Sequence, residues 1–240
     1  MFSGKRIAII IPALNEARSI TKVIKHIPGY VDEIVVVDNG STDQTDVMAR
    51  AAGARVVYQS VRGYGAACLA GIRTLRNVDV VGFVDGDYSD YPDDLRKLLE
   101  PVAGGEYDFA MGQRECEDSN IVAIPMHQKL GNWFACHLIH RLHGFSFLDL
   151  GPMRCLTKEL LLDLRMEDED FGWTTEMQIK VLRARARILL TPVRYRKRIG
   201  QSKISGTFKG SLLAGYKIIY WTVRLSLSSS VRRVEQQASL

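Results

Sequence analysis

The feature that most constrains the fold of this chain is the alternation of short apolar runs with helical patterns over its first 112 residues. The apolar runs have the length and composition of buried strands and lie at residues 7–11, 34–37, 54–58, 78–84 and 107–111. The helical patterns lie at residues 17–27, 44–52, 65–76 and 93–103. Strands and helices that alternate at this spacing form a parallel sheet with right-handed crossovers, so the pattern predicts an α/β fold.

The second half of the chain is less regular. We predict, in order, a loop at residues 113–126, a helix at 127–143, a strand at 152–156, a helix at 173–186, a strand at 188–195 and a helical segment at 207–227. A chain of 240 residues, of which 46% are hydrophobic, can bury the core of one domain. We therefore expect a single domain that folds on its own.

Positive charge is concentrated toward the end of the chain, although the net charge is only +5. Residues 177–234 contain 14 Lys and Arg and no Asp or Glu, which leaves about −9 for the remainder. A cationic surface of this kind binds anionic lipid, nucleic acid or a phosphorylated substrate. Charge alone does not distinguish these partners.

The cysteines and the N-terminus indicate the cellular compartment in which we expect the protein. The four cysteines form no Cys-x-x-Cys pair and have apolar neighbours, so we expect reduced core residues of a cytosolic protein. The first apolar run is short and is interrupted by Pro12, which favours a strand over a signal peptide. No segment has the roughly 20 apolar residues needed to span a bilayer.

Polar or glycine-rich residues follow four of the predicted strands at the point where each strand ends. These segments are residues 12–16, 38–43, 62–65 and 85–87. The carboxyl ends of parallel strands lie at one edge of a sheet, and open parallel sheets bind their ligands at that edge. We therefore expect the four segments to converge on one binding site.

Asp85 and Asp87 follow the fourth predicted strand and are separated by one glycine. Two carboxylates so spaced can bind one hard cation, whose remaining ligands are often phosphate oxygens. The pair suggests a metal-bound nucleotide diphosphate, although Asp-Gly is also a common turn sequence. Asp38 is either a ligand of a base or ribose or an Asx-turn residue. Gly63 and Gly65 either admit phosphates close to backbone amides or serve a tight turn.

Seven motifs occur here in the same order as in the family 2 glycosyltransferases. They are Pro12-Ala13-Leu14-Asn15-Glu16, Val37-Asp38-Asn39-Gly40-Ser41-Thr42-Asp43, Arg62-Gly63-Tyr64-Gly65, Asp85-Gly86-Asp87, Gly112-Gln113-Arg114, Gly172-Trp173 with Glu176-Met177, and Arg198-x-Gly-x-Ser202-Lys203. Over roughly residues 7–210 the chain resembles these GT-A enzymes, and within them the dolichol-phosphate-mannose synthase-like branch. The resemblance implies a three-layer α/β sandwich around a mostly parallel sheet.

The motifs supply candidate site residues, most of them by the positions that they hold in the family. The candidates for binding the nucleotide sugar are Pro12, Asn15, Glu16, Asp38, Gly63, Gly65 and Asp85. Those for binding Mg²⁺ or Mn²⁺ are Asp85 and Asp87, and those for catalysis are Asp87, Arg114 and Glu176. Those for binding the acceptor or its phosphate are Arg114, Lys129, Arg198, Ser202 and Lys203.

Some positions depart from the family pattern. Asn39 replaces the second aspartate of the usual Val-Asp-Asp-Gly-Ser, and Ser89 replaces the glutamine of the metal site. Residues 149–154 match the family's Asp-to-Gly-Phe-Arg segment only approximately, and no serine near Gly131 matches that of the acceptor loop. A third protein ligand for the metal is therefore not evident.

The reaction that the resemblance implies is metal-dependent, inverting transfer of a sugar from a nucleotide diphosphate. The metal would take up charge on the leaving diphosphate. A hydroxyl acceptor also needs a general base, whereas a phosphate acceptor is already ionised and needs cations. Because the chain is rich in arginine after Met177, we favour a polyprenyl (dolichyl or undecaprenyl) phosphate acceptor. We predict a glycosyltransferase domain at residues 1–210, with a nucleotide-binding half at 1–112 and an acceptor half at 113–210.

Three other functions would account for parts of this pattern. The closest enzymatic alternative is the same donor chemistry with a soluble hydroxyl acceptor. A sugar nucleotidyltransferase would normally have a glycine- and arginine-rich loop after its first strand, where this chain has residues 12–16. A non-catalytic basic module that binds membrane or nucleic acid through residues 180–210 would leave the acidic and glycine-rich segments unexplained.

Glu176 has a second interpretation, an intrahelical ion pair with Lys180 four residues later, which the sequence favours over catalysis. His137, His140 and His143 recur every three residues, which rotates them around a helix and disfavours a shared zinc ion. The acidic residues 167–170 are expected to form a solvated loop.

The segment at residues 208–227 mixes apolar side chains and a Tyr-Trp pair with lysine and arginine. This pattern suits either a helix at a membrane interface or a helix packed on the sheet with its polar side outward. We predict an amphipathic helix and tail at residues 207–240 that associate with an anionic membrane surface. The expected location is the cytoplasmic, inner face of the plasma membrane, and no nucleic-acid partner is expected.

Overall fold

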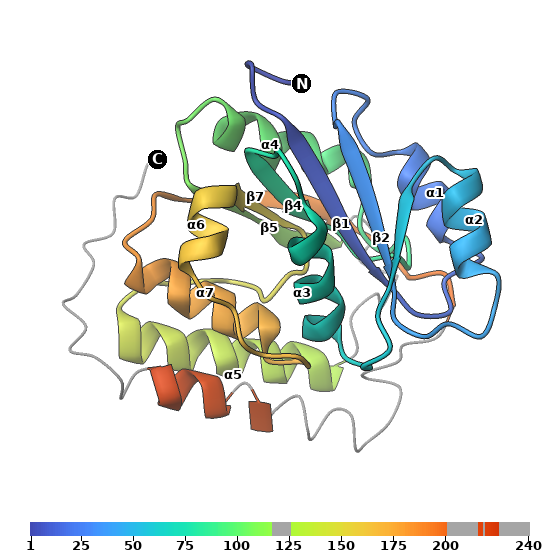
Figure 1. Cartoon of the computed structure of the whole chain (residues 1–240). Helices are drawn as coiled ribbons and strands as arrows, with labels where there is room; N and C mark the ends of the chain where they lie inside the picture. The colour runs from blue at the N-terminus through green and yellow to red at the C-terminus, as the bar shows by residue number, and fades with distance from the viewer. Residues whose placement is uncertain (117–125, 201–215, 218, 226–240) are drawn as a thin grey trace.

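The computed structural model describes residues 1–116, 126–200, 216, 217 and 219–225, with the backbone alone at residues 116 and 126–130. Its strands are β1 (Ile7–Ala13), β2 (Glu33–Asp38), β3 (Arg55–Tyr58), β4 (Val80–Phe83), β5 (Phe109–Cys116), β6 (Arg154–Thr157) and β7 (Ile188–Tyr195). They form one sheet in the order β3-β2-β1-β4-β6-β5-β7 (Figure 1). The sheet is parallel except for β6, which is antiparallel to both of its neighbours.

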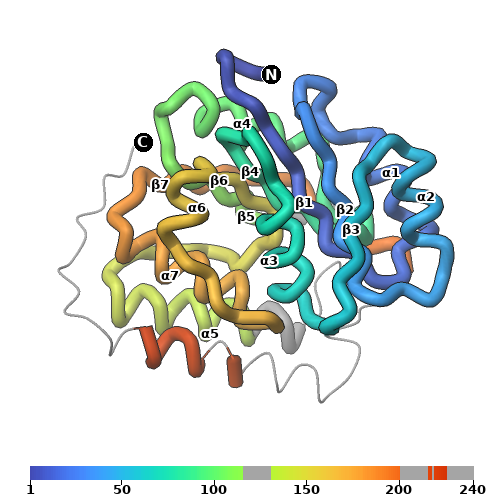
Figure 2. The backbone as a smooth tube through the Cα atoms, in the orientation of Figure 1, coloured from blue at the N-terminus to red at the C-terminus, as the bar shows by residue number. Residues whose placement is uncertain are grey.

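The α-helices are α1 (Ile20–Lys25), α2 (Thr45–Ala51), α3 (Tyr64–Thr74), α4 (Arg96–Ala103), α5 (Met126–His143), α6 (Lys158–Asp163) and α7 (Trp173–Arg183), and a 3₁₀ turn, η1 (Pro92–Leu95), precedes α4. The described part of residues 216–225 is also helical and is called the C-terminal segment below. The tube in Figure 2 follows the chain through these elements. The C-terminal segment contacts the end of α7, where Nη1 of Arg183 donates to the carbonyl of Leu225 at 3.0 Å. The predicted mostly parallel α/β sandwich is confirmed.

Side chains that alternate along the strands divide the core into two layers. In β1, Ala8 and Ile10 belong to one cluster, whereas Ile7, Ile9 and Ile11 belong to the other. The first cluster contains side chains of α3, α5, α6 and α7, and the second contains side chains of α1, α2 and α4. Helices therefore cover both faces of the sheet, as period-two burial in central strands requires.

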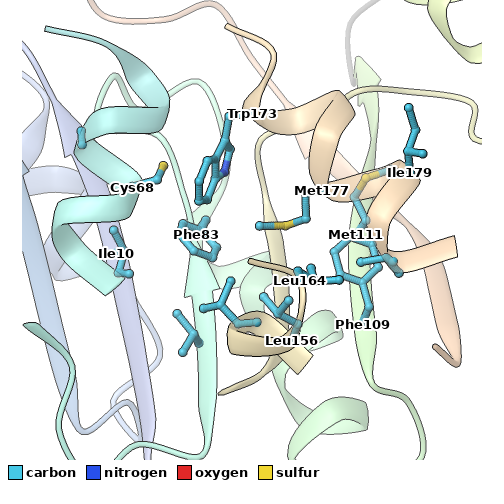
Figure 3. Packing of buried hydrophobic residues seen from close by; sticks show 14 of the residues in the cluster. Ile10, Cys68, Phe83, Phe109, Met111, Leu156, Leu164, Trp173, Met177 and Ile179 are labelled. Carbon is cyan, nitrogen blue, oxygen red and sulfur yellow. The ribbon is translucent and has the colours of Figure 1, made fainter. Parts of the chain in front are cut away.

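The cluster beneath α7 contains large, fully buried side chains. Figure 3 shows Phe83 and Met111 of the sheet facing Trp173 and Met177 of α7, and the ring centroids of Phe83 and Trp173 lie 6.1 Å apart. Each such side chain stabilises the fold by about 1.5–3 kcal/mol through burial. This packing fixes the position of α7 and of the loop that precedes it.

Two elements differ from the prediction. Strand β5 continues to Cys116, where a loop was expected, because Gly112 to Cys116 pair in parallel register with β7. Helix α6 was not expected; it begins after Thr157, whose hydroxyl accepts the amide of Leu160 at 3.3 Å. The first difference depends on pairing with a distant strand and the second on a capping hydroxyl, and neither is evident from local periodicity.

Cys68, Cys136 and Cys155 are buried and free, which confirms their prediction as core thiols; the side chain of Cys116 lies outside the described part. Among the described helices, none is both long enough and apolar enough to cross a bilayer.

Candidate active site

A cavity of about 530 Å³ lies at the carboxyl ends of β1, β2 and β4. It is lined by Pro12, Ala13, Leu14, Glu16, Asn39, Arg62, Gly63, Tyr64, Ala67, Asp85, Gly86, Asp87, Asp170, Phe171 and Arg198. The structure therefore brings together parts of all four segments that the sequence placed at one sheet edge. The volume lies in the range of small-molecule sites.

Asp85 and Asp87 are held by different partners in this cavity. Asp85 Oδ1 accepts the hydroxyl of Tyr64 at 3.1 Å. Asp87 Oδ1 accepts the amide and hydroxyl of Ser89 at 2.9 and 2.6 Å, and its Oδ2 lies 2.9 Å from Nη1 of Arg198. Burial and the charge of Asp87 raise the pKa of Asp85 above its usual range. A bound cation would reverse that effect, because it favours the ionised carboxylate.

Asp90 adds a third buried carboxyl group beside this pair. It is 1% exposed, and neither of its oxygens has a hydrogen-bond partner among the described residues. Burial, followed by the charges of Asp85 and Asp87, raises its pKa well above the usual range. In the absence of a cation, the neutral, protonated form of this carboxyl group is therefore favoured.

The donor set fits a hard divalent cation that is completed by its substrate. Within the described ranges, no group of three or more His, Cys, Asp and Glu side chains is placed to hold a metal ion. Asp85 and Asp87 thus offer two carboxylates and leave other positions for further oxygens. Mg²⁺ is commonly held in this way, by one or two carboxylates with substrate phosphates and water.

Asn39, which lines the cavity, connects the end of β2 to the segment that follows β3. Its Nδ2 donates to the carbonyls of Gln59 and Val61 at 3.0 and 2.6 Å, and its Oδ1 accepts the amide of Gly63 at 2.8 Å. A carboxylate could not donate to the two carbonyls. Asn39, which stands where the family pattern usually has aspartate, therefore has a structural role.

Asn15 and Asp38 both hydrogen-bond to the turn at residues 41–42. Asn15 Oδ1 accepts the amide of Thr42 at 2.8 Å, and Asp38 Oδ1 accepts the amide of Ser41 at 2.8 Å. Asp38 is 7% exposed and is not among the lining residues of the cavity. The turn role that the sequence allowed for Asp38 is therefore observed.

Arg114 lies at a second cavity, of about 350 Å³. This cavity is lined by Arg114, Asn132, Trp133, Cys136, His137, His140, Ser146, Phe147 and Leu148. The guanidinium group of Arg114 binds Asp149 through two contacts, of 2.6 and 2.7 Å, and lies 5.0 Å from the ring centroid of Tyr195. Although burial alone would raise the pKa of Asp149, Arg114 holds it below its usual range.

Glu176 lies outside both cavities and is 0% exposed. Its two oxygens accept the amides of Glu167 and Asp168, each at 2.8 Å. The ion pair with Lys180 is present, with Nζ 2.7 Å from Oε1. Burial raises the pKa of Glu176, and these partners counteract the shift. Glu176 is thus engaged by its own loop and helix.

The remaining candidates fall in different places. His137 and His140 line the second cavity, while His143 is buried. The prediction of a solvated acidic loop is wrong for Asp168, which is 2% exposed because it binds Lys217 and Trp221. The side chain of Lys129, and all of Ser202 and Lys203, lie outside the described part of the structure.

Sequence patterns gave no role to Tyr64, Asp90 or Arg154. Arg154 is 1% exposed, donates to the carbonyls of Gly151, Pro152 and Thr174, and is electrostatically coupled to Asp85. The approximate family motif at residues 149–154 was the available signal for Arg154. No sequence pattern pointed to Asp90, because a polar residue that is buried in a loop has no periodic signature.

Comparison with known proteins places these features in a family context. Residues 8–160 match the family model described as Glycosyl transferase family 2. An uncharacterized glycosyltransferase of Mycobacterium tuberculosis is 33% identical over 214 residues, which are 88% of this chain and 95% of that protein. A dolichyl-phosphate hexose transferase of Haloferax volcanii is 31% identical over 217 residues, covering 89% of this chain and 92% of the relative.

Two further proteins extend the comparison. An undecaprenyl-phosphate mannosyltransferase of Micrococcus luteus is 30% identical over 220 residues, with 85% and 90% of the two chains covered. The fold is similar to that of glucosyl-3-phosphoglycerate synthase from Mycobacterium tuberculosis, solved with Mn²⁺, uridine diphosphate and phosphoglyceric acid. That match has a TM-score of 0.74 at 23% identity and covers 93% of this chain and 79% of the other.

Proposed function

We propose that this chain, a glycosyltransferase that belongs to glycosyl transferase family 2, transfers a sugar from a nucleotide diphosphate to a polyprenyl phosphate with inversion. The observation that carries the proposal is the joint position of Asp85, Asp87 and Arg198 on one cavity wall at the carboxyl ends of the strands. Two carboxylates and a guanidinium group can bind a metal and a diphosphate together.

The donor is proposed to occupy the 530 Å³ cavity. Pro12, Glu16 and Gly63 line it and would contact the nucleotide sugar, while Asn15 and Asp38 would shape its floor through the turn at residues 41–42. Mg²⁺ or Mn²⁺ held by Asp85 and Asp87 would supply positive charge for the leaving diphosphate.

The chain's own residues would order the reacting groups. Tyr64 and Ser89 hold the carboxylates of Asp85 and Asp87 in fixed orientations through hydrogen bonds of 3.1 and 2.6 Å. Arg198 lines the same cavity and can donate two parallel hydrogen bonds to diphosphate oxygens. Such preorganised charge acts without reorganisation during the reaction.

The acceptor is proposed to bind in the second cavity. Arg114 lines this cavity with a guanidinium group whose charge is partly balanced by Asp149, and the lining residues Trp133 and Leu148 are 61% and 72% exposed. A cation beside exposed apolar side chains suits a lipid phosphate, because the phosphate and the chain each find a matching surface. Lys129, Ser202 and Lys203 remain proposed partners of the acceptor phosphate.

Membrane association is proposed through the C-terminal segment. Tyr216, Ile219, Tyr220 and Val223 are between 39% and 61% exposed and lie on one short helical stretch with Arg224. Aromatic and basic side chains together favour a lipid interface. The proposed location is the cytoplasmic face of the plasma membrane, on an anionic surface.

A soluble phosphorylated acceptor is the second candidate. It is favoured by the similarity in fold to an enzyme solved with phosphoglyceric acid. Both candidates keep the same donor site and differ only in what occupies the second cavity.

The test is a transfer assay that offers labelled nucleotide-diphosphate sugars with Mn²⁺ to polyprenyl phosphate and, separately, to 3-phosphoglycerate. We expect product on the lipid, its loss in Asp87→Asn, and its retention in the exposed control Asp93→Asn. Product on 3-phosphoglycerate alone would replace the lipid acceptor with the soluble one, and full activity of Asp87→Asn would reject the proposed metal site.

A further inference from the structure

Residues 167–171, which we call the strap, connect the α6 region to α7 and cross the N-terminus of α3. The amides of Gly65 and Ala66 donate to the strap carbonyls of Asp170 and Glu169 at 3.2 and 2.7 Å. The strap ends with Asp170 and Phe171, which are among the residues that line the 530 Å³ cavity. One wall of the donor cavity is therefore formed by this loop.

The strap lies so close to α3 that only glycine fits beneath it. A Cβ atom at Gly65 would lie 1.9 Å from the carbonyl oxygen of Asp168, and one at Gly63 would lie 2.1 Å from that of Glu169. The absence of side chains at Gly63 and Gly65 thus allows the strap to pack against the N-terminus of α3. The amides of residues 65 and 66 are already hydrogen-bonded to strap carbonyls. Displacement of the strap would move the cavity wall directly.

Two sets of contacts hold the strap in this position. On the inner side, the buried carboxylate of Glu176 accepts the amides of Glu167 and Asp168. On the outer side, Asp168 Oδ2 accepts Nε1 of Trp221 at 2.5 Å and Nζ of Lys217 at 3.1 Å. The inner contacts come from α7, and the outer ones come from the C-terminal segment.

Asp168 connects these parts through one buried side chain. Its Oδ1 accepts the amides of Asp170 and Gly172 at 2.7 and 3.0 Å, while its Oδ2 faces the C-terminal segment. A Cβ at Gly172 would lie 2.3 Å from Cδ1 of Trp221, so the indole ring packs directly on the start of α7. Trp221 is 3% exposed. The strap and the C-terminal segment therefore share a buried, charge-assisted contact.

We propose that Asp168 and Trp221 are positioning residues for the donor, through which the C-terminal segment holds the strap against α3 and shapes the donor cavity. The identity of the ligand in this inference rests on the proposed nucleotide-sugar function. The contact between the strap and the C-terminal segment does not. Neither residue touches the donor; each acts through the position of Asp170 and Phe171. Because coupling is reciprocal, donor binding should in turn stabilise the seated C-terminal segment.

The test compares Trp221→Phe, which removes the indole N–H and keeps an aromatic ring, with Val47→Ser, which changes an exposed apolar side chain of α2 that lines neither cavity. The dissociation constant of a nucleotide-diphosphate sugar with Mn²⁺ is measured by titration calorimetry, and the KM for each substrate by transfer assay. We expect Trp221→Phe to weaken donor binding by about fivefold or more, with little change in the KM of the acceptor. Val47→Ser should match the wild type.

Hydrogen exchange of the amides of Gly65 and Ala66 gives a readout that needs no donor. Trp221→Phe and Asp168→Asn should both exchange faster than the wild type there, since a looser strap exposes these amides. Unchanged exchange and unchanged donor affinity in a folded variant would overturn the proposal. If the wild type binds no nucleotide sugar, the proposed function fails, while faster exchange in the variants would still support the coupling.

Discussion

Replacing Glu176 with glutamine separates a structural role of this residue from a catalytic one. The carboxylate accepts two amides at 2.8 Å and lies 2.7 Å from Nζ of Lys180. Glutamine keeps the shape but has one acceptor oxygen, so one buried amide loses its partner and the ion pair is lost.

The expected cost follows from those contacts. A buried donor without a partner costs about 1–3 kcal/mol, and breaking a buried ion pair costs about 3–5 kcal/mol when the remaining charge is stranded. Lys180 is not stranded, because it also donates to the carbonyl of Arg165 at 2.7 Å. We therefore expect Glu176→Gln to lower the free energy of unfolding by about 2–4 kcal/mol.

Urea denaturation followed by circular dichroism measures the stability, and a transfer assay well below the melting temperature measures the activity. Glu159→Gln, on the exposed side of α6, is the matched control and should change neither quantity. We expect Glu176→Gln to retain a kcat close to that of the wild type and to raise the KM of the donor through the strap. A folded variant whose kcat falls by the roughly 10²- to 10⁴-fold typical of a lost general base would refute the structural role and the phosphate acceptor with it.

Three further predictions concern the two cavities and the strap. Because burial and neighbouring aspartates raise the pKa values of Asp85 and Asp90, the metal-free folded protein holds protons that the unfolded chain has released. Its stability is therefore greatest below the ordinary carboxyl pKa and falls as the pH rises toward the raised values, by up to about 1.4 kcal/mol per pH unit for each group. Melting in EDTA from pH 5 to 9 should show this slope, and Asp90→Asn should flatten it; an equal slope in the variant would contradict the assignment. Gly65→Ala should destabilise the fold by about 1–3 kcal/mol, because its Cβ would meet the carbonyl of Asp168, and an unchanged midpoint in urea would show that the strap yields freely. Trp133→Ala should raise the KM of a polyprenyl phosphate severalfold and leave that of the donor unchanged, whereas equal effects on both would argue against the second cavity as the acceptor site.

Local sequence patterns predicted most of the architecture. The apolar runs at residues 7–11 and 34–37 became central strands because burial on both faces leaves no alternative for such residues. The extension of β5 to Cys116 was missed because it depends on pairing with β7, about 80 residues away in the chain. Periodicity shows which side chains of a segment face the core, but it does not show which strand the segment will pair with.

In the candidate site, too, local patterns identified some residues, whereas the roles of others depend on contacts with distant parts of the chain. Asp85 and Asp87 could be predicted from the sequence to line the cavity, because they follow a buried strand at the edge where open parallel sheets bind ligands. Asp168 was misjudged because its partner Trp221 is 53 residues away, and a run of acidic residues ordinarily faces solvent. Asn39 was seen as a departure from a motif, yet its two carbonyl acceptors, those of Gln59 and Val61, follow the end of β3. Contacts of this kind become visible only when the chain is folded.

The central claim is that Asp85 and Asp87 hold a divalent ion against the diphosphate of a sugar donor. Titration calorimetry of a nucleotide-diphosphate sugar, with and without Mn²⁺, into the wild type, Asp87→Asn and the exposed control Asp93→Asn tests it most directly. We predict Mn²⁺-dependent binding in the wild type and the control and loss of the Mn²⁺ dependence in Asp87→Asn. Binding that is equally tight without Mn²⁺, or unchanged in Asp87→Asn, would contradict the claim.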